Sequence, residues 1–152
     1  GYSLTVAGLV VSFMTLMQIV GLISTSFLGD RINKRSIVIT CMMLHAIGML
    51  LLSYADNLWM VIGFAAFHGI AWGSRGPLMQ AIRADYFGTS HFGSIMGWSS
   101  IIVMLGMAFG PVYAGYIADH TGSYQAAFNS LAGAALIGAI FFLLAKQPCR
   151  TK

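Results

Sequence analysis

The heptapeptide Gly29-Asp30-Arg31-Ile32-Asn33-Lys34-Arg35 separates two long apolar runs and decides the fold class of this chain. It holds three of the eight Lys and Arg residues and one of the four acidic residues, although only 8% of the 152 residues are charged and 58% are hydrophobic. A soluble domain carries about 25% charged residues. Charge concentrated in this way is typical of a short loop between two membrane-spanning helices. We therefore expect an integral membrane protein embedded in a lipid bilayer.

Four short polar segments divide the rest of the chain into apolar runs. A bilayer core of about 30 Å takes about 20 helical residues, and each run is long enough to cross it once. Short loops favour a compact antiparallel arrangement. The sequence predicts an all-α fold, a polytopic membrane helix bundle of five transmembrane helices in one membrane domain, residues 1–152. The expected spans are about 4–28, 36–54, 58–84, 94–118 and 123–145.

The basic residues predict the direction of the spans. They lie in the first loop, at the edge of the third and in the C-terminal tail, whereas the second and fourth loops hold no Lys or Arg. The positive-inside rule then places the C-terminus in the cytoplasm, at the plasma (inner) membrane. The N-terminus would lie outside, so we expect a fragment that lacks a preceding helix. The net charge of +4 comes from helix-flanking residues without an aromatic-interleaved patch, which argues against nucleic acid as a partner.

The segment 27–35 resembles the loop signature of the major facilitator superfamily, which reads glycine, acid, base, glycine and two bases. Asn33 stands where the family has glycine, and Asn tolerates the left-handed backbone that such a turn can require. The segments 84–88, 92–97, 110–111 and 115–124 look like helices ten to twelve of monocarboxylate and oxalate–formate members. The resemblance covers essentially the whole chain. It implies helices eight to twelve, a partial major facilitator fold, with the N-terminal half of the same protein as missing partner.

The resemblance also implies a gating and packing role for the residues of the loop signature and of the third loop. Gly29 would let a helix approach closely, and Asp30 would lie near the positive end of a neighbouring helix. The alternative is that these are solvated charges that only set topology. The residues concerned are Gly29, Asp30, Arg31, Lys34, Arg35, Asp85 and Gly88.

Arg75 is the strongest candidate for a substrate ligand because it lies well inside the third span. An arginine at the middle of a membrane helix costs about 2.5–3.5 kcal/mol on insertion scales, so it should face protein or water. His68, Trp72 and Arg75 have the spacing i, i+4, i+7 and share one helix face. A guanidinium suits a carboxylate in a bidentate pair. The alternative is that Arg75 snorkels to the cytoplasmic interface.

Two histidines and one glutamine are further polar residues within the spans. His68 is a candidate for relaying a coupling proton, and His45 is a weaker one. A hydrogen-bonded histidine in the core is the commoner role for both. Gln18 is a candidate substrate contact or an interhelical hydrogen-bonding group. Related carboxylate carriers often place a cation in the helix of Gln18, so its absence argues against a dicarboxylate substrate.

Glycine and proline residues mark two helices where packing or bending is expected. Gly76 and Pro77 would soften the third span beside Arg75. Gly106, Gly110 and Pro111 in the fourth span predict either close helix packing or a flexing gate.

Three functions are open to such a chain. The first is a secondary active transporter that moves a small-molecule substrate, an organic anion such as a monocarboxylate, by alternating access. The second is a non-transporting five-helix scaffold or partner subunit. An intramembrane enzyme is the third, and the spans lack a nucleophile–base pair for it. No spacing suggests a metal cluster or a nucleotide loop, so we expect no cofactor, no metal and no enzymatic activity.

Overall fold

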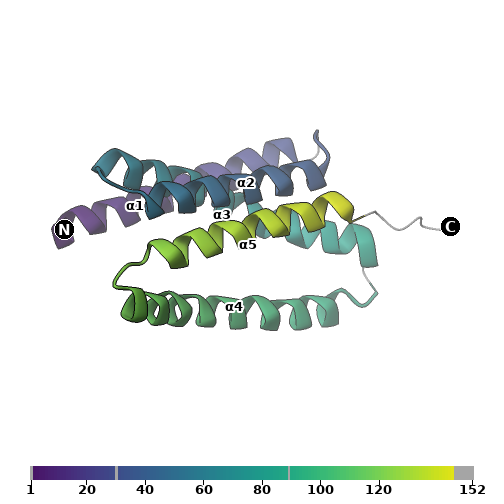
Figure 1. Ribbon diagram of the computed structural model, residues 1–152. Helices are drawn as coiled ribbons and strands as arrows, with labels where there is room; N and C mark the ends of the chain where they lie inside the picture. The colour runs from purple at the N-terminus through teal and green to yellow at the C-terminus, as the bar shows by residue number, and fades with distance from the viewer. Residues whose placement is uncertain (1, 30, 89, 146–152) are drawn as a thin grey trace.

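The computed structural model describes residues 2–29, 31–88 and 90–145, which form five helices and, within those residues, no strand. Figure 1 shows them as a bundle of long, roughly antiparallel rods. The predicted all-α class and five-helix order are confirmed, with boundaries within three residues of those expected. The helices are α1 (Leu4–Leu28), α2 (Lys34–Ser53), α3 (Leu58–Phe87), α4 (Phe92–Thr121) and α5 (Gln125–Leu144).

Asparagine side chains cap the N-termini of α2 and α3. The Asn33 Oδ1 atom accepts a hydrogen bond from the backbone N–H of Arg35 at 3.0 Å, and Asn57 Oδ1 accepts from Met60 at 3.2 Å. Such a cap satisfies one of the backbone donors that a helix start leaves unpaired. Asn33 has φ −56° and is not left-handed, so the expected reason for Asn at this position is wrong. Its side chain starts α2 instead.

Glycines with positive φ end α3 and α4. Gly88 has φ 76° and Gly122 has φ 72°, a region in which a side chain is strained. The Gly88 N–H donates to the Ala84 carbonyl at 3.0 Å and the Gly122 N–H to Ala118 at 2.8 Å, which closes the last turn of each helix.

Helix α3 occupies the centre of the bundle and contacts α1, α2 and, more sparsely, α4. Helix α2 also packs on α5, and α5 on α4. In Figure 1, α4 lies apart from the other helices along most of its length. Among the described residues α1 and α2 do not pack together, although they are consecutive. Sequence neighbours are therefore not always spatial neighbours here.

Three glycines allow α1 and α3 to approach with their backbones in contact. A Cβ atom on Gly73 would lie 2.7 Å from the carbonyl carbon and 2.8 Å from the Cα of Gln18. A Cβ on Gly69 would lie 2.8 Å from that of Met17, and one on Gly21 would lie 2.9 Å from the carbonyl carbon of Ile70. This is the small-residue packing that membrane helices use in place of a hydrophobic driving force.

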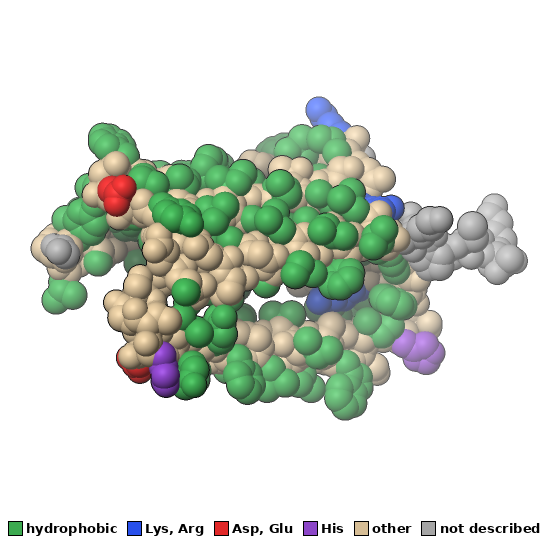
Figure 2. All heavy atoms as spheres, viewed as in Figure 1, with side chains coloured by type: hydrophobic (Ala, Val, Ile, Leu, Met, Phe, Trp, Pro, Cys, Tyr) green, Lys and Arg blue, Asp and Glu red, His purple; other side chains and the backbone are tan. Residues whose placement is uncertain are grey.

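Four helices, all except α3, are long and apolar enough to cross a membrane. Helix α3 carries His68, Ser74 and Arg75 and lies among its neighbours, which is where a polar membrane helix is stable. Figure 2 shows apolar side chains along the visible length of the bundle, with basic side chains near one end and acidic side chains near the other. This distribution matches an integral membrane protein.

Candidate functional site

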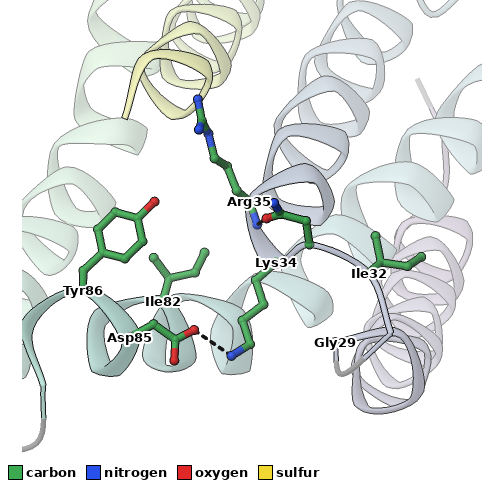
Figure 3. Close-up of a pocket in the computed structure, with 8 residues that line it drawn as sticks. Gly29, Ile32, Lys34, Arg35, Ile82, Asp85 and Tyr86 are labelled. Carbon is green, nitrogen blue, oxygen red and sulfur yellow. Dashed lines mark hydrogen bonds and ion pairs between the residues drawn. The ribbon is translucent and has the colours of Figure 1, made fainter. Parts of the chain in front are cut away.

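An ion pair joins the start of α2 to the end of α3. The Lys34 Nζ atom lies 2.7 Å from the Asp85 Oδ2 atom, with the two side chains 32% and 41% exposed. Both residues line a cavity of about 410 Å³, together with Gly29, Arg35 and Tyr86 (Figure 3). The pair brings the first and third loops to the same end of the bundle, as antiparallel crossing requires.

The side chain of Arg35 binds the C-terminal end of α5. Its Nε atom donates to the Phe142 carbonyl at 2.5 Å, and its Nη2 atom donates to the Leu143 carbonyl. Carbonyls at a helix C-terminus have no partner within the helix and carry partial negative charge, so a guanidinium there satisfies both needs. Figure 3 shows Arg35 reaching from α2 toward α5, away from Lys34.

The residues of the loop signature therefore take different positions. Lys34 and Arg35 bind neighbouring helices, whereas Arg31 is exposed. The only described atoms within 4 Å of a Cβ on Gly29 belong to Thr25 of its own helix, so no other helix uses the space that this glycine leaves. Gly88 acts as the C-cap of α3, and Asp30 lies outside the described residues.

Helix α3 aligns Arg75, Trp72 and His68 on one face, as their spacing predicts. The Arg75 Cζ atom lies 4.9 Å from the centroid of the Trp72 ring, a cation–π distance. The Trp72 ring stacks on the His68 ring, with centroids 6.0 Å apart and planes 19° apart. Trp72 thus contacts both the cation and the imidazole.

His68 also contacts His45 of α2. The Nδ1 atoms of the two rings lie 3.1 Å apart, which is a hydrogen bond if one ring carries its proton on Nδ1. His45 is 7% exposed, and its buried Nε2 atom has no hydrogen-bond partner among the described residues. A buried polar atom without a partner costs about 1–3 kcal/mol. In the neutral pair one Nδ1–H donates to the other Nδ1, so an additional proton would go to the outer Nε2 atom of the donating ring, because a second proton between the rings would place two N–H groups face to face.

Arg75 lines a cavity of about 290 Å³ between α3 and α4, closed at one side by Met42 of α2. Arg83, two turns further along α3, lines the same cavity, and Ser100 and Met104 contribute the wall from α4. Figure 2 shows basic side chains within the hollow between α4 and the helices above it. In residues 2–29, 31–88 and 90–145, neither guanidinium has a carboxylate partner.

Gln18 contacts α3 through its backbone and not through its side chain. The contact with Gly73 of α3 is made by main-chain atoms, and the Gln18 amide forms no hydrogen bond with any described residue. The interhelical hydrogen bond weighed for its side chain is therefore not formed among those residues.

The glycine and proline positions divide into two groups. Pro77 lies inside α3 beside Gly76, which lines the cavity of Arg75. Pro111 lies inside α4, where Cβ atoms on Gly106 and Gly110 would meet no described atom within 4 Å. The close helix packing expected of these two glycines is not made by the described part of the chain.

Sequence reasoning missed two features of the site: the contact of His45, which was only a weaker candidate for the proton relay, with His68, and the presence of Arg83 in the cavity of Arg75. His45 contacts His68 across two helices, and no spacing within one helix shows such a pair. Arg83 was placed at the edge of the third loop, yet it follows Arg75 by eight residues on α3, so extending the helical spacing by two turns would have found it. Gly69 and Gly73 form a small-xxx-small pattern that also predicts the α1 contact.

Comparison with known proteins agrees with this architecture. The sequence model of the Major Facilitator Superfamily matches residues 1–152. Monocarboxylate transporter 2 of Rattus norvegicus is 31% identical over 82% of this chain and 25% of its own length. Monocarboxylate transporter 7 of Homo sapiens is 26% identical over 95% of the chain and 28% of its own length. The tetracycline resistance protein, class B, of Escherichia coli is 26% identical over 82% of this chain and 31% of its own length.

No solved structure matches the chain significantly. The chain spans about a quarter to a third of the length of these relatives. The resemblance to monocarboxylate transporters of the superfamily is confirmed. The five helices, their apolar surfaces and the match over the full sequence together show that this chain belongs to the Major Facilitator Superfamily.

Proposed function

We propose that this chain is part of a secondary active transporter that moves a small organic anion, such as a monocarboxylate, by alternating access. The observation that carries the proposal is the position of Arg75, a guanidinium on the central helix that lines a cavity and has no described carboxylate partner. The names of two relatives, which are monocarboxylate transporters, support the same substrate class.

The chemistry of Arg75 favours an anion as its ligand. A cation placed within a membrane protein is stable only when it faces a counter-charge, a carbonyl or water. The Trp72 ring covers one side of the guanidinium and leaves the N–H groups without hydrogen bonds to the described residues. A carboxylate would satisfy two of them in a planar pair.

The experiment compares Arg75→Lys and Arg75→Gln with the wild-type natural protein that contains this chain. A panel of monocarboxylates is titrated against each purified protein. Because an ammonium cannot form the bidentate pair, Arg75→Lys should weaken binding by about 1.5–3 kcal/mol, or about 10- to 150-fold. Lys snorkels as well as Arg, so wild-type affinity in Arg75→Lys would mean that Arg75 lies at the interface and does not hold the substrate.

We further infer that the His45–His68 pair holds the coupling proton. The 3.1 Å contact and the unpartnered Nε2 atom of His45 support a site with capacity for one proton. His68→Gln should abolish anion accumulation driven by a pH gradient while exchange of anions across the membrane continues. The matched control is His91→Gln, which changes an exposed histidine at the start of α4. Gradient-driven accumulation that survives in His68→Gln would refute this role.

The remaining features of the proposal concern the whole protein. The basic residues of the first loop support a cytoplasmic C-terminus at the plasma (inner) membrane. Alternating access needs two halves, and the chain spans only about a quarter to a third of its relatives. We therefore assign the opposite wall of the pathway to an N-terminal half of the same protein.

A further inference from the structure

A second guanidinium lies in the cavity that holds Arg75. Arg83 lines the same space of about 290 Å³, and its one hydrogen bond to a described residue goes to the Sδ atom of Met96 at 3.2 Å. A thioether sulfur is a weak acceptor for a charged donor, so this contact leaves most of the guanidinium's hydrogen-bonding capacity unused. Two half-buried cations without described carboxylates therefore share one cavity.

The helix fixes the distance between the backbone positions of the two arginines. Arg75 and Arg83 are eight residues apart, which corresponds to about 12 Å along the axis of α3. If each guanidinium stays near the level of its own backbone position, a single carboxylate held by Arg75 does not reach Arg83. A molecule with an acidic group at each end of a short aliphatic spacer can reach both.

The walls between the two arginines suit such a spacer. Methionine side chains from three helices line the cavity, Met42 of α2, Met79 of α3 and Met104 of α4, and Ser100 is the polar group on α4. Methionine side chains are flexible and adapt to apolar ligands of different shape. The cavity is polar at its two cations and mainly apolar between them.

We propose that Arg75 and Arg83 together bind one small organic dianion, with one carboxylate at each guanidinium. This inference rests on the proposed anion transport and narrows its substrate class. It also revises the argument against a dicarboxylate, because the second cation comes from α3 itself and not from the helix that carries Gln18.

The test is a binding titration on the purified natural protein that contains this chain. Succinate, glutarate and adipate are compared with butyrate, pentanoate and hexanoate, which have the same chain lengths and one carboxylate each. Wild type should bind at least one dicarboxylate about 10- to 150-fold more tightly than the monocarboxylate of equal length, at one site per protein. Arg83→Gln should remove that difference, because it should lower dicarboxylate affinity much more than monocarboxylate affinity.

Other results would overturn the proposal. Equal affinity of wild type for the two ligand series would show that Arg83 holds no carboxylate. An equal loss of affinity for dicarboxylates and monocarboxylates in Arg83→Gln would show that Arg83 has a structural role and does not bind a carboxylate. If Arg83→Gln does not fold, Arg83→Lys keeps the charge, and it should lower dicarboxylate affinity selectively because the bidentate geometry is lost.

The titration with the Arg75 and Arg83 variants distinguishes an error in the dianion site from an error in the proposed anion transport. If Arg75→Gln loses binding of every anion while Arg83→Gln behaves as wild type, the dianion site is wrong and anion transport stands. If wild type binds no anion of either series, both proposals fall.

Discussion

The contact between α1 and α3 predicts that Gly73→Ala destabilises the protein. The added Cβ would lie 2.7 Å from the carbonyl carbon of Gln18 and closer still to its oxygen, whereas an ordinary contact starts at 3.4 Å, so the two backbones must separate by more than about 0.7 Å. The neighbour is backbone and cannot change rotamer. Overpacking of this kind costs about 1–3 kcal/mol.

A matched substitution isolates that cost. Gly97→Ala in α4 adds the same methyl group to a helix interior, where it meets no described atom within 4 Å. Replacing glycine by alanine within a helix stabilises it by about 0.5–1 kcal/mol. This gain applies to both variants, so Gly73→Ala should be less stable than Gly97→Ala by about 1–3 kcal/mol.

The assay is reversible unfolding of the purified natural protein in mixed detergent micelles, followed by the loss of helical circular dichroism. The difference between the two variants is the quantity compared, because the unfolded reference state is shared. Equal free energies of unfolding for Gly73→Ala and Gly97→Ala would refute the argument that backbone contact at Gly73 holds α1 against α3.

Three other predictions concern the end of the bundle that carries the basic residues. A double-mutant cycle on Lys34 and Asp85, measured as free energies of unfolding, should give a coupling energy of about 0.2–1 kcal/mol, because the two side chains are 32% and 41% exposed. A coupling energy of zero would mean that the pair does not form. Asp30→Asn should lower uptake per molecule at the cell surface more than it lowers the amount of protein, and unchanged normalised uptake would leave Asp30 only a topological role. Single cysteines at Asn33 and Asn57 should react with impermeant maleimide from the cytoplasm and from outside, respectively, and the reverse pattern would invert the predicted topology.

The helix boundaries could be predicted because loops and spans differ sharply in composition. Asn57 and Gly88 lie at the borders of apolar runs, and the structure uses them as caps. The alignment of His68, Trp72 and Arg75 follows from helical geometry alone. These are local properties, which a sequence expresses directly.

Contacts between helices could not be predicted in the same way. The Lys34–Asp85 pair, the His45–His68 pair and the capping of α5 by Arg35 all join different helices. Their formation depends on which faces meet, and apolar faces toward lipid and toward protein look alike in a membrane sequence. For the same reason the expected packing glycines were placed in α4, whereas the observed close approach uses glycines of α1 and α3.

The absence of packing between α1 and α2 has a consequence for biosynthesis. A chain enters the membrane from its N-terminal end, so α1 and α2 are inserted before α3 is made. In the described residues these two helices do not contact each other; α1 packs on α3, and α2 packs on α3 and α5. Helix α3 is also the segment with Arg75 inside it, which lipid alone accepts poorly. Within this segment, two apolar helices are thus synthesised before the polar helix α3, and their surfaces can pack against α3 as it enters the membrane.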